Sequence, residues 1–161
     1  MSGHNIVYYL AWPALIAVAA FAWWKGDRPV RLSGGMFLIS SIVAWLIDHT
    51  LGRGPGAVPM LVNDGLLAFG FLAVAMRYGS LWLAAVMLLQ GVQFSLHAYY
   101  FVVEKPHDLF YGWVNNLDTY GLMACLLGGG IVAMRRRAEA RRNQPLAQPA
   151  SATGAAGPVS S

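Results

Sequence analysis

The sequence has little charge. Only 11% of its 161 residues are Asp, Glu, Lys or Arg, whereas soluble domains carry about 25% of these residues. Hydrophobic residues make up 57% of the chain. A water-soluble fold of this composition would expose large apolar patches, which soluble monomers rarely do. The shortage of charge therefore excludes an ordinary soluble domain and predicts an integral membrane protein whose solvent is the bilayer.

Cysteine and recognisable catalytic motifs are also scarce. The single cysteine, Cys125, lies in an apolar stretch and has no second cysteine in the chain with which to form a disulfide. The sequence contains no HExxH, HxxxH or CxxC pattern and no phosphate-binding P-loop. These absences leave the common zinc-hydrolase, thiol-redox and nucleotide-binding classes without support. We therefore assign no catalytic residue and favour a non-enzymatic protein.

The chain does contain a series of long apolar stretches. A transmembrane helix needs about 20 mostly apolar residues. The stretches that come near or exceed this length are 6–24, 32–51, 59–76, 81–103 and 108–134. They predict an all-α fold, an integral membrane bundle of five transmembrane helices formed by residues 1–142. Residues 143–161 are rich in Gln, Pro, Ala, Ser and Gly, which predicts a disordered tail.

The basic residues are unevenly divided between the two ends of these stretches. With five spans, nine Lys and Arg residues fall on one side and only Arg53 and Lys105 on the other. The nine are Lys25, Arg28, Arg31, Arg77, Arg135, Arg136, Arg137, Arg141 and Arg142. Because basic residues favour the cytoplasmic side, the sequence predicts an outer N-terminus, a cytoplasmic C-terminus and a bacterial inner membrane. The five arginines after the last span are also suited to anionic lipids. Because the net positive charge of the chain comes from this one segment, it does not indicate a nucleic-acid-binding surface.

Four acidic or histidine side chains lie furthest inside the predicted spans. Asp48, Asp64, His97 and Asp118 all lie toward the predicted outer side, and Asp118 is as much as ~15 Å deep at ~1.5 Å per residue. An ionised group at the bilayer centre costs at least ~2.5–3.5 kcal/mol. Ionisable residues within a span are therefore candidates for a functional site.

Helical phase indicates that these groups face other helices. Gln90, Gln93 and His97 share one face of the helix predicted at 81–103. Tyr111, Asn115 and Asp118 share one face at 108–134. Gly34, Ser41 and Asp48 share one face at 32–51. Small residues on the same faces favour close helix packing. We therefore predict a ligand, ion or proton site from His97, Asp118, Asp64, Asp48, Gln93 and Asn115. A metal site from His97, Asp118, Asp64 and His49 is a weaker prediction, and the sequence names no cofactor.

A looser pattern runs from Asp64 to Gly129. It comprises Asp64, Arg77 and Trp82 around a tight turn, Gln90, His97, Tyr111 and a glycine-rich final span. This stretch, under half of the chain, resembles a group of small alphaproteobacterial membrane proteins to which no activity is assigned. The resemblance implies a fold and no mechanism, and it favours His97 and Asp64 over His107. The turn at residues 78–81 departs from the group, which is richer there in Trp and Pro.

Three functions fit these observations. The first is a non-enzymatic inner-membrane protein, either a subunit of a larger complex or a small transport or sensing component, with a polar site in the outer half of the bundle. The second is a membrane-embedded metal-dependent or redox enzyme that uses the same His and Asp residues. The third is a purely structural membrane subunit, joined to a membrane-protein partner or to a second copy of itself, whose polar residues join the helices by hydrogen bonds.

Overall fold

The computed structural model describes residues 4–52, 57–104, 106 and 108–143. This part of the chain is all-helical, as predicted, and contains five helices. They are α1 (His4–Lys25), α2 (Arg28–Leu51), α3 (Ala57–Tyr78), α4 (Leu81–Val102) and α5 (Leu109–Asn143). The predicted tail after Asn143 lies outside the described residues, so its disorder stays a prediction.

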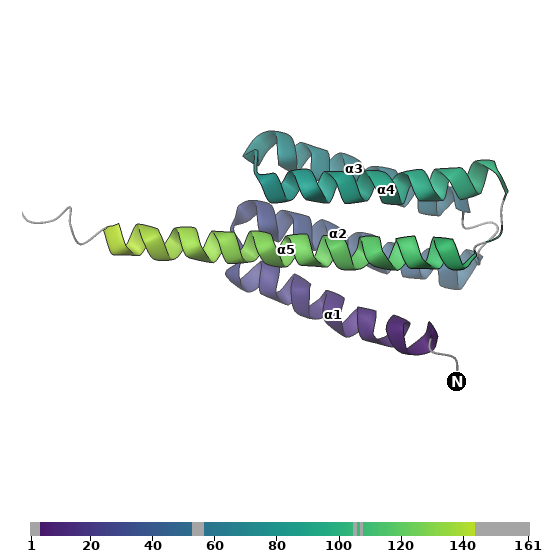
Figure 1. The fold of residues 1–161 in the computed structure, drawn as a ribbon, viewed down its shortest axis with the longest axis horizontal. Helices are drawn as coiled ribbons and strands as arrows, with labels where there is room; N and C mark the ends of the chain where they lie inside the picture. Colours follow the sequence, from purple (N-terminus) through teal and green to yellow (C-terminus); the bar gives the residue numbers. More distant parts are fainter. Residues whose placement is uncertain (1–3, 53–56, 105, 107, 144–161) are drawn as a thin grey trace, which may run out of the picture.

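Successive helices run in opposite directions along one bundle (Figure 1). Each helix packs against its neighbours in sequence, α1 closes against α5, and α2 also contacts α5. The α1–α2 and α3–α4 turns lie at one end, which we call the basic end, and α5 projects beyond the bundle there. The α2–α3 and α4–α5 connections lie at the opposite end, which we call the acidic end after Asp48, Glu104 and Asp108.

Four helices, α2 to α5, are long and apolar enough to cross a membrane. Their surfaces agree with that assignment, because large apolar side chains lie on the outside: Phe69 is 71% exposed, Leu88 75% and Leu117 73%. The interior is also apolar, with Phe71 and Leu83 fully buried. A surface as apolar as the core matches a bilayer as solvent.

The basic end is tied together around the turn between α1 and α2. Asp27 caps α2, where its side chain accepts a hydrogen bond from the Val30 amide at 3.3 Å. This cap starts α2 at Arg28, four residues before the apolar stretch begins. Arg31 and Arg137 each donate to the Gly26 carbonyl at 3.0 Å. These positive groups satisfy carbonyls at the end of α1, where the helix dipole favours cations.

Helix α5 is longer than the sequence predicted. We expected the span to end at residue 134, but the helix continues through the arginines to Asn143. Arginine is a good helix former, so the loss of hydrophobicity ends the apolar span without ending the helix. At ~1.5 Å per residue, its 35 residues reach about 52 Å, well beyond the ~30 Å hydrocarbon core.

Close packing of α5 against α1 gives a first prediction. A methyl group added at Gly130 would lie 2.5 Å from the Phe21 ring, whereas one added at Gly128 would meet nothing within 4 Å. Gly130→Ala should therefore destabilise the bundle by about 1–3 kcal/mol through overpacking. The matched change Gly128→Ala should be neutral or stabilise it by up to ~1 kcal/mol, because alanine favours helix.

Unfolding of both variants in detergent micelles, followed by circular dichroism, measures this difference. Equal stabilities for the two variants would contradict the packing of α5 against α1.

Candidate functional site

A hydrogen-bonded chain of three side chains links α3, α4 and α5. The His97 Nδ1 contacts the Asp64 Oδ2, and the His97 Nε2 lies 2.5 Å from the Tyr111 hydroxyl oxygen. The side chains of His97 and Asp64 are each only 9% exposed. An ionised carboxylate can only accept, so against a neutral imidazole Nδ1 donates to Asp64 and Nε2 accepts from Tyr111. We call these three residues the Asp64–His97–Tyr111 relay.

The relay occupies positions that are apolar elsewhere on the same helix faces. On α3, Asp64 belongs to a buried stripe with Leu67, Phe71 and Val74. The spacing of three and four residues is that of one helix face packed against its neighbours. Asp64 is therefore a carboxylate placed where the fold otherwise puts core hydrophobics, and it is buried because its helix face is buried.

Three amide side chains extend the polar layer toward the middle of the bundle. Gln93 donates to the Asn115 Oδ1 at 2.6 Å, so the structure joins these two predicted residues across α4 and α5. Gln90, which is fully buried, donates to the backbone carbonyl of Asp64 at 3.3 Å. These bonds fix α4 against both of its neighbours, as interhelical polar contacts do in lipid.

Asp118 lies deepest of the predicted residues. It is 2% exposed, nine residues after the start of α5, or roughly 13 Å along the helix axis. Neither carboxyl oxygen has a hydrogen-bond partner among the described residues. Asp118 is close enough to Asp64 and His97 for their charges to interact. It is thus part of the same polar region without being bonded into the relay.

Toward the acidic end, the relay is continued by residues that the site prediction did not include. The Tyr100 hydroxyl donates to the Asp108 Oδ1 at 2.5 Å, and the Tyr111 amide donates to the same oxygen at 2.9 Å. The rings of Tyr100 and Tyr111 meet edge to face, with centroids 5.0 Å apart. Asp108 is exposed. The polar residues therefore run from the exposed end of the helices to the buried relay. Tyr100 follows His97 by three residues, and this spacing is the signal that could have identified it.

Two predicted residues on α2 lie outside this region. Asp48 and His49 are both exposed, and His49 stacks on Trp45 with ring centroids 5.3 Å apart. The predicted alignment with Gly34 does not bring Asp48 to the site, because Asp48 is exposed and the face it shares with Gly34 does not meet α4 or the relay. At Gly34 the face also points toward α1, where an added methyl would lie 2.9 Å from the Ala22 Cβ.

The metal prediction receives no support from the described residues. Within them, no three His, Cys, Asp or Glu side chains are grouped so that they could hold one metal ion. His97 and Asp64 already contact each other, and His49 lies on another helix, α2, where it stacks on Trp45. His107 lies outside the described residues. The polar region therefore offers hydrogen-bonding and proton-transfer chemistry rather than a ligand set.

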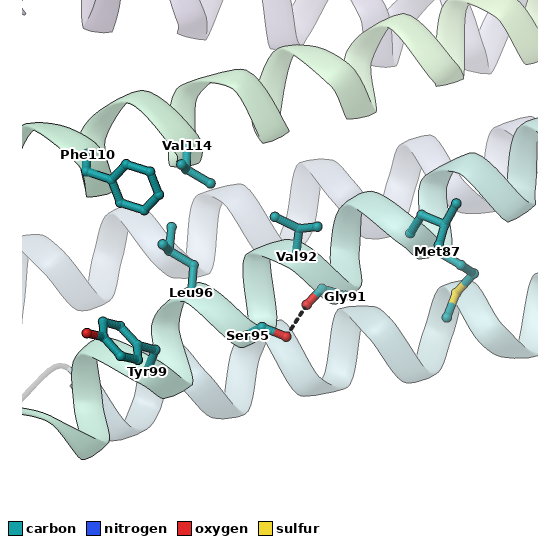
Figure 2. A pocket seen from close by; sticks show the side chains of 9 residues that line it. Met87, Gly91, Val92, Ser95, Leu96, Tyr99, Phe110 and Val114 are labelled. Carbon is teal, nitrogen blue, oxygen red and sulfur yellow. Dashed lines mark hydrogen bonds between the residues drawn. The ribbon is translucent and has the colours of Figure 1, made fainter.

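An apolar groove lies on the outer surface of α4 and α5 (Figure 2). Its volume is about 620 Å³, and it is lined by Met87, Leu88, Gly91, Val92, Ser95, Leu96, Tyr99, Phe110 and Val114. The Ser95 hydroxyl is already satisfied by the Gly91 carbonyl at 2.7 Å. No residue of the Asp64–His97–Tyr111 relay lines the groove. The groove is part of the apolar surface and does not open the polar region.

The fold and the site define a class of protein, a small helical bundle with a buried hydrogen-bonded network and four helices long and apolar enough to cross a membrane. No protein-family model, curated protein sequence or solved structure matches this chain. Its chemistry therefore has to be argued from the geometry above.

The contact between Asp64 and His97 gives a second prediction. In a double-mutant cycle, Asp64→Asn and His97→Gln should couple by about 0.5–2 kcal/mol, because each variant removes the same charged hydrogen bond. Asp48→Asn and His97→Gln should instead be additive within about 0.5 kcal/mol, since Asp48 is exposed on another helix. Unfolding free energies of the variants in micelles provide the measurement. A coupling no larger for Asp64 than for Asp48 would refute the pairing.

Proposed function

We propose that this protein is a small, non-enzymatic transport component that moves protons through the outer half of a bacterial inner membrane. The observation that carries the proposal is the Asp64–His97–Tyr111 relay, in which both nitrogens of one buried imidazole have partners that exchange protons. Histidine is suited to this role because its unperturbed pKa lies near neutral pH. Intramembrane ionisable residues commonly mark proton pathways.

Among the described residues, the relay has a polar approach to the surface on one side only. Toward the acidic end, Tyr100 and Asp108 continue it to an exposed carboxylate. Toward the basic end, the buried faces of the same helices carry Phe71, Leu122 and Leu126, each at most 3% exposed. This apolar layer separates the relay from the other surface. Passage across it requires the helices to move, which makes the pathway gated in our proposal.

The proposed membrane arrangement has five spans, with α1 added to the four apolar helices. The excess of Lys and Arg at the basic end supports a cytoplasmic location for that end. The relay then takes up protons from the outer side. Arg141 and Arg142 are exposed in the last turn of α5, where they suit anionic headgroups of the cytoplasmic leaflet.

The orientation gives a third prediction. A reporter active only in the cytoplasm, fused after Ser161, should be active, because nine of the eleven basic residues lie on the predicted cytoplasmic side. A periplasmic alkaline-phosphatase reporter fused at the same point should be inactive. The reverse pattern would overturn the orientation and would place the relay on the cytoplasmic side.

The relay gives a fourth prediction. Liposomes containing the wild-type protein and an internal pH dye should acidify when a potassium-diffusion potential drives protons inward. His97→Gln should slow this flux about 100-fold or more, the range that a positioned proton-transferring side chain contributes. His49→Gln is the matched control, because this exposed histidine on α2 is outside the relay, and it should retain the wild-type rate.

Two results would contradict the proposal. Wild-type liposomes that acidify no faster than empty ones would exclude proton movement. A His97→Gln variant that is folded by circular dichroism and conducts like the wild type would show that the relay is structural.

A further inference from the structure

The buried polar atoms without partners near the relay share one property: they are acceptors. Both carboxyl oxygens of Asp118 and the Oε1 atoms of Gln90 and Gln93 are buried and have no hydrogen-bond partner among the described residues. The Gln90 amide group cannot simply be reversed, because its Nε2 is needed to donate to the carbonyl of Asp64. This part of the bundle therefore lacks a hydrogen-bond donor for these acceptor oxygens.

The register of α4 and α5 puts these oxygens at one level. Gln93 on α4 is bonded to Asn115 on α5, and the two helices are antiparallel neighbours. One helical turn further from the acidic end, the same two faces carry Gln90 and Asp118. Both residues are at most 2% exposed. The carboxyl group of Asp118 and the Oε1 of Gln90, which both lack a partner among the described residues, thus belong to the same layer of the bundle.

We propose that Asp118 is a proton-binding site, a neutral carboxylic acid in the resting protein that serves as the inner proton store of the Asp64–His97–Tyr111 relay. An ionised carboxylate at this depth, with no donor to either oxygen, would cost at least ~2.5–3.5 kcal/mol. Binding one proton removes the charge and supplies the missing donor. A proton also requires no additional space between closely packed helices.

The store can exchange its proton with the relay. Three titratable groups surround Asp118 closely enough to interact with it electrostatically: Asp64 on α3, His97 on α4 and Cys125 on its own helix. When the proton passes from Asp118 to Asp64, one O–H bond breaks and another forms. One carboxylate is then replaced by the other, and the total charge does not change. Two carboxyl groups close enough for their charges to interact favour sharing a single proton in this way.

This inference rests on the proposed function for its role, but its test does not depend on proton flux. Infrared spectra of the wild-type protein in liposomes at neutral pH should show the carbonyl stretch of one protonated carboxylic acid, shifted to lower frequency in heavy water. Asp118→Asn should lose this band, and Asp118→Glu should restore it at a shifted frequency. The matched control Asp48→Asn should keep it, because Asp48 is exposed.

The wild-type spectrum decides the question even if Asp118→Asn does not fold. Absence of a protonated-carboxyl band would overturn the proposal. So would a band present in choline chloride and lost in sodium chloride, because a sodium ion would then occupy the site. A band without proton flux would refute the proposed function and leave the proton on Asp118. Proton flux without the band would support the proposed function and refute the proton-binding site on Asp118.

Discussion

The contact between His97 and Asp64 sets the constraint on which the arrangement of α3, α4 and α5 depends. In hydrocarbon, a polar side chain has no water to satisfy it, so each group must find its partner on another helix. His97 uses both ring nitrogens, one toward α3 and one toward α5. Sliding either neighbour by one turn, about 5.4 Å, would separate these partners. The relay therefore fixes the register of three helices at once.

The same constraint divides the bundle into two functional halves. Near the acidic end, the buried helix faces carry hydroxyl, imidazole, amide and carboxyl groups. Near the basic end, the same faces carry Phe71, Leu83 and Leu126, which pack by shape alone. In the proposed function, the polar half exchanges protons with the outer side, and the apolar half prevents them from leaking across. A protein of this size needs both halves to act as a gated pathway.

Hydrophobic length was enough to predict an all-helical bundle, because a membrane span has few alternatives to a helix. The cost of burying charge also singled out Asp64, His97 and Asp118, all of which the structure buries. The structure places Asp48 apart from the other candidates, because phase along one helix does not say which neighbouring helix a face meets. Tyr100 and Asp108 were missed because a loop aspartate and an interfacial tyrosine look solvated until the fold brings them together. Hydropathy falls at residue 134, where the predicted span ends. The helix itself continues to Asn143, because arginine favours helix although it is not apolar.

The central claim is that His97 is held between Asp64 and Tyr111 within the membrane. Solid-state NMR of the protein in liposomes, with labelled aspartate and histidine, tests it directly. The account predicts a strong dipolar coupling between the Asp64 carboxyl carbon and the His97 Nδ1, lost in Asp64→Ala and retained in Asp48→Ala. An absence of this coupling in the wild type, in a sample whose other interhelical contacts are present, would contradict the account.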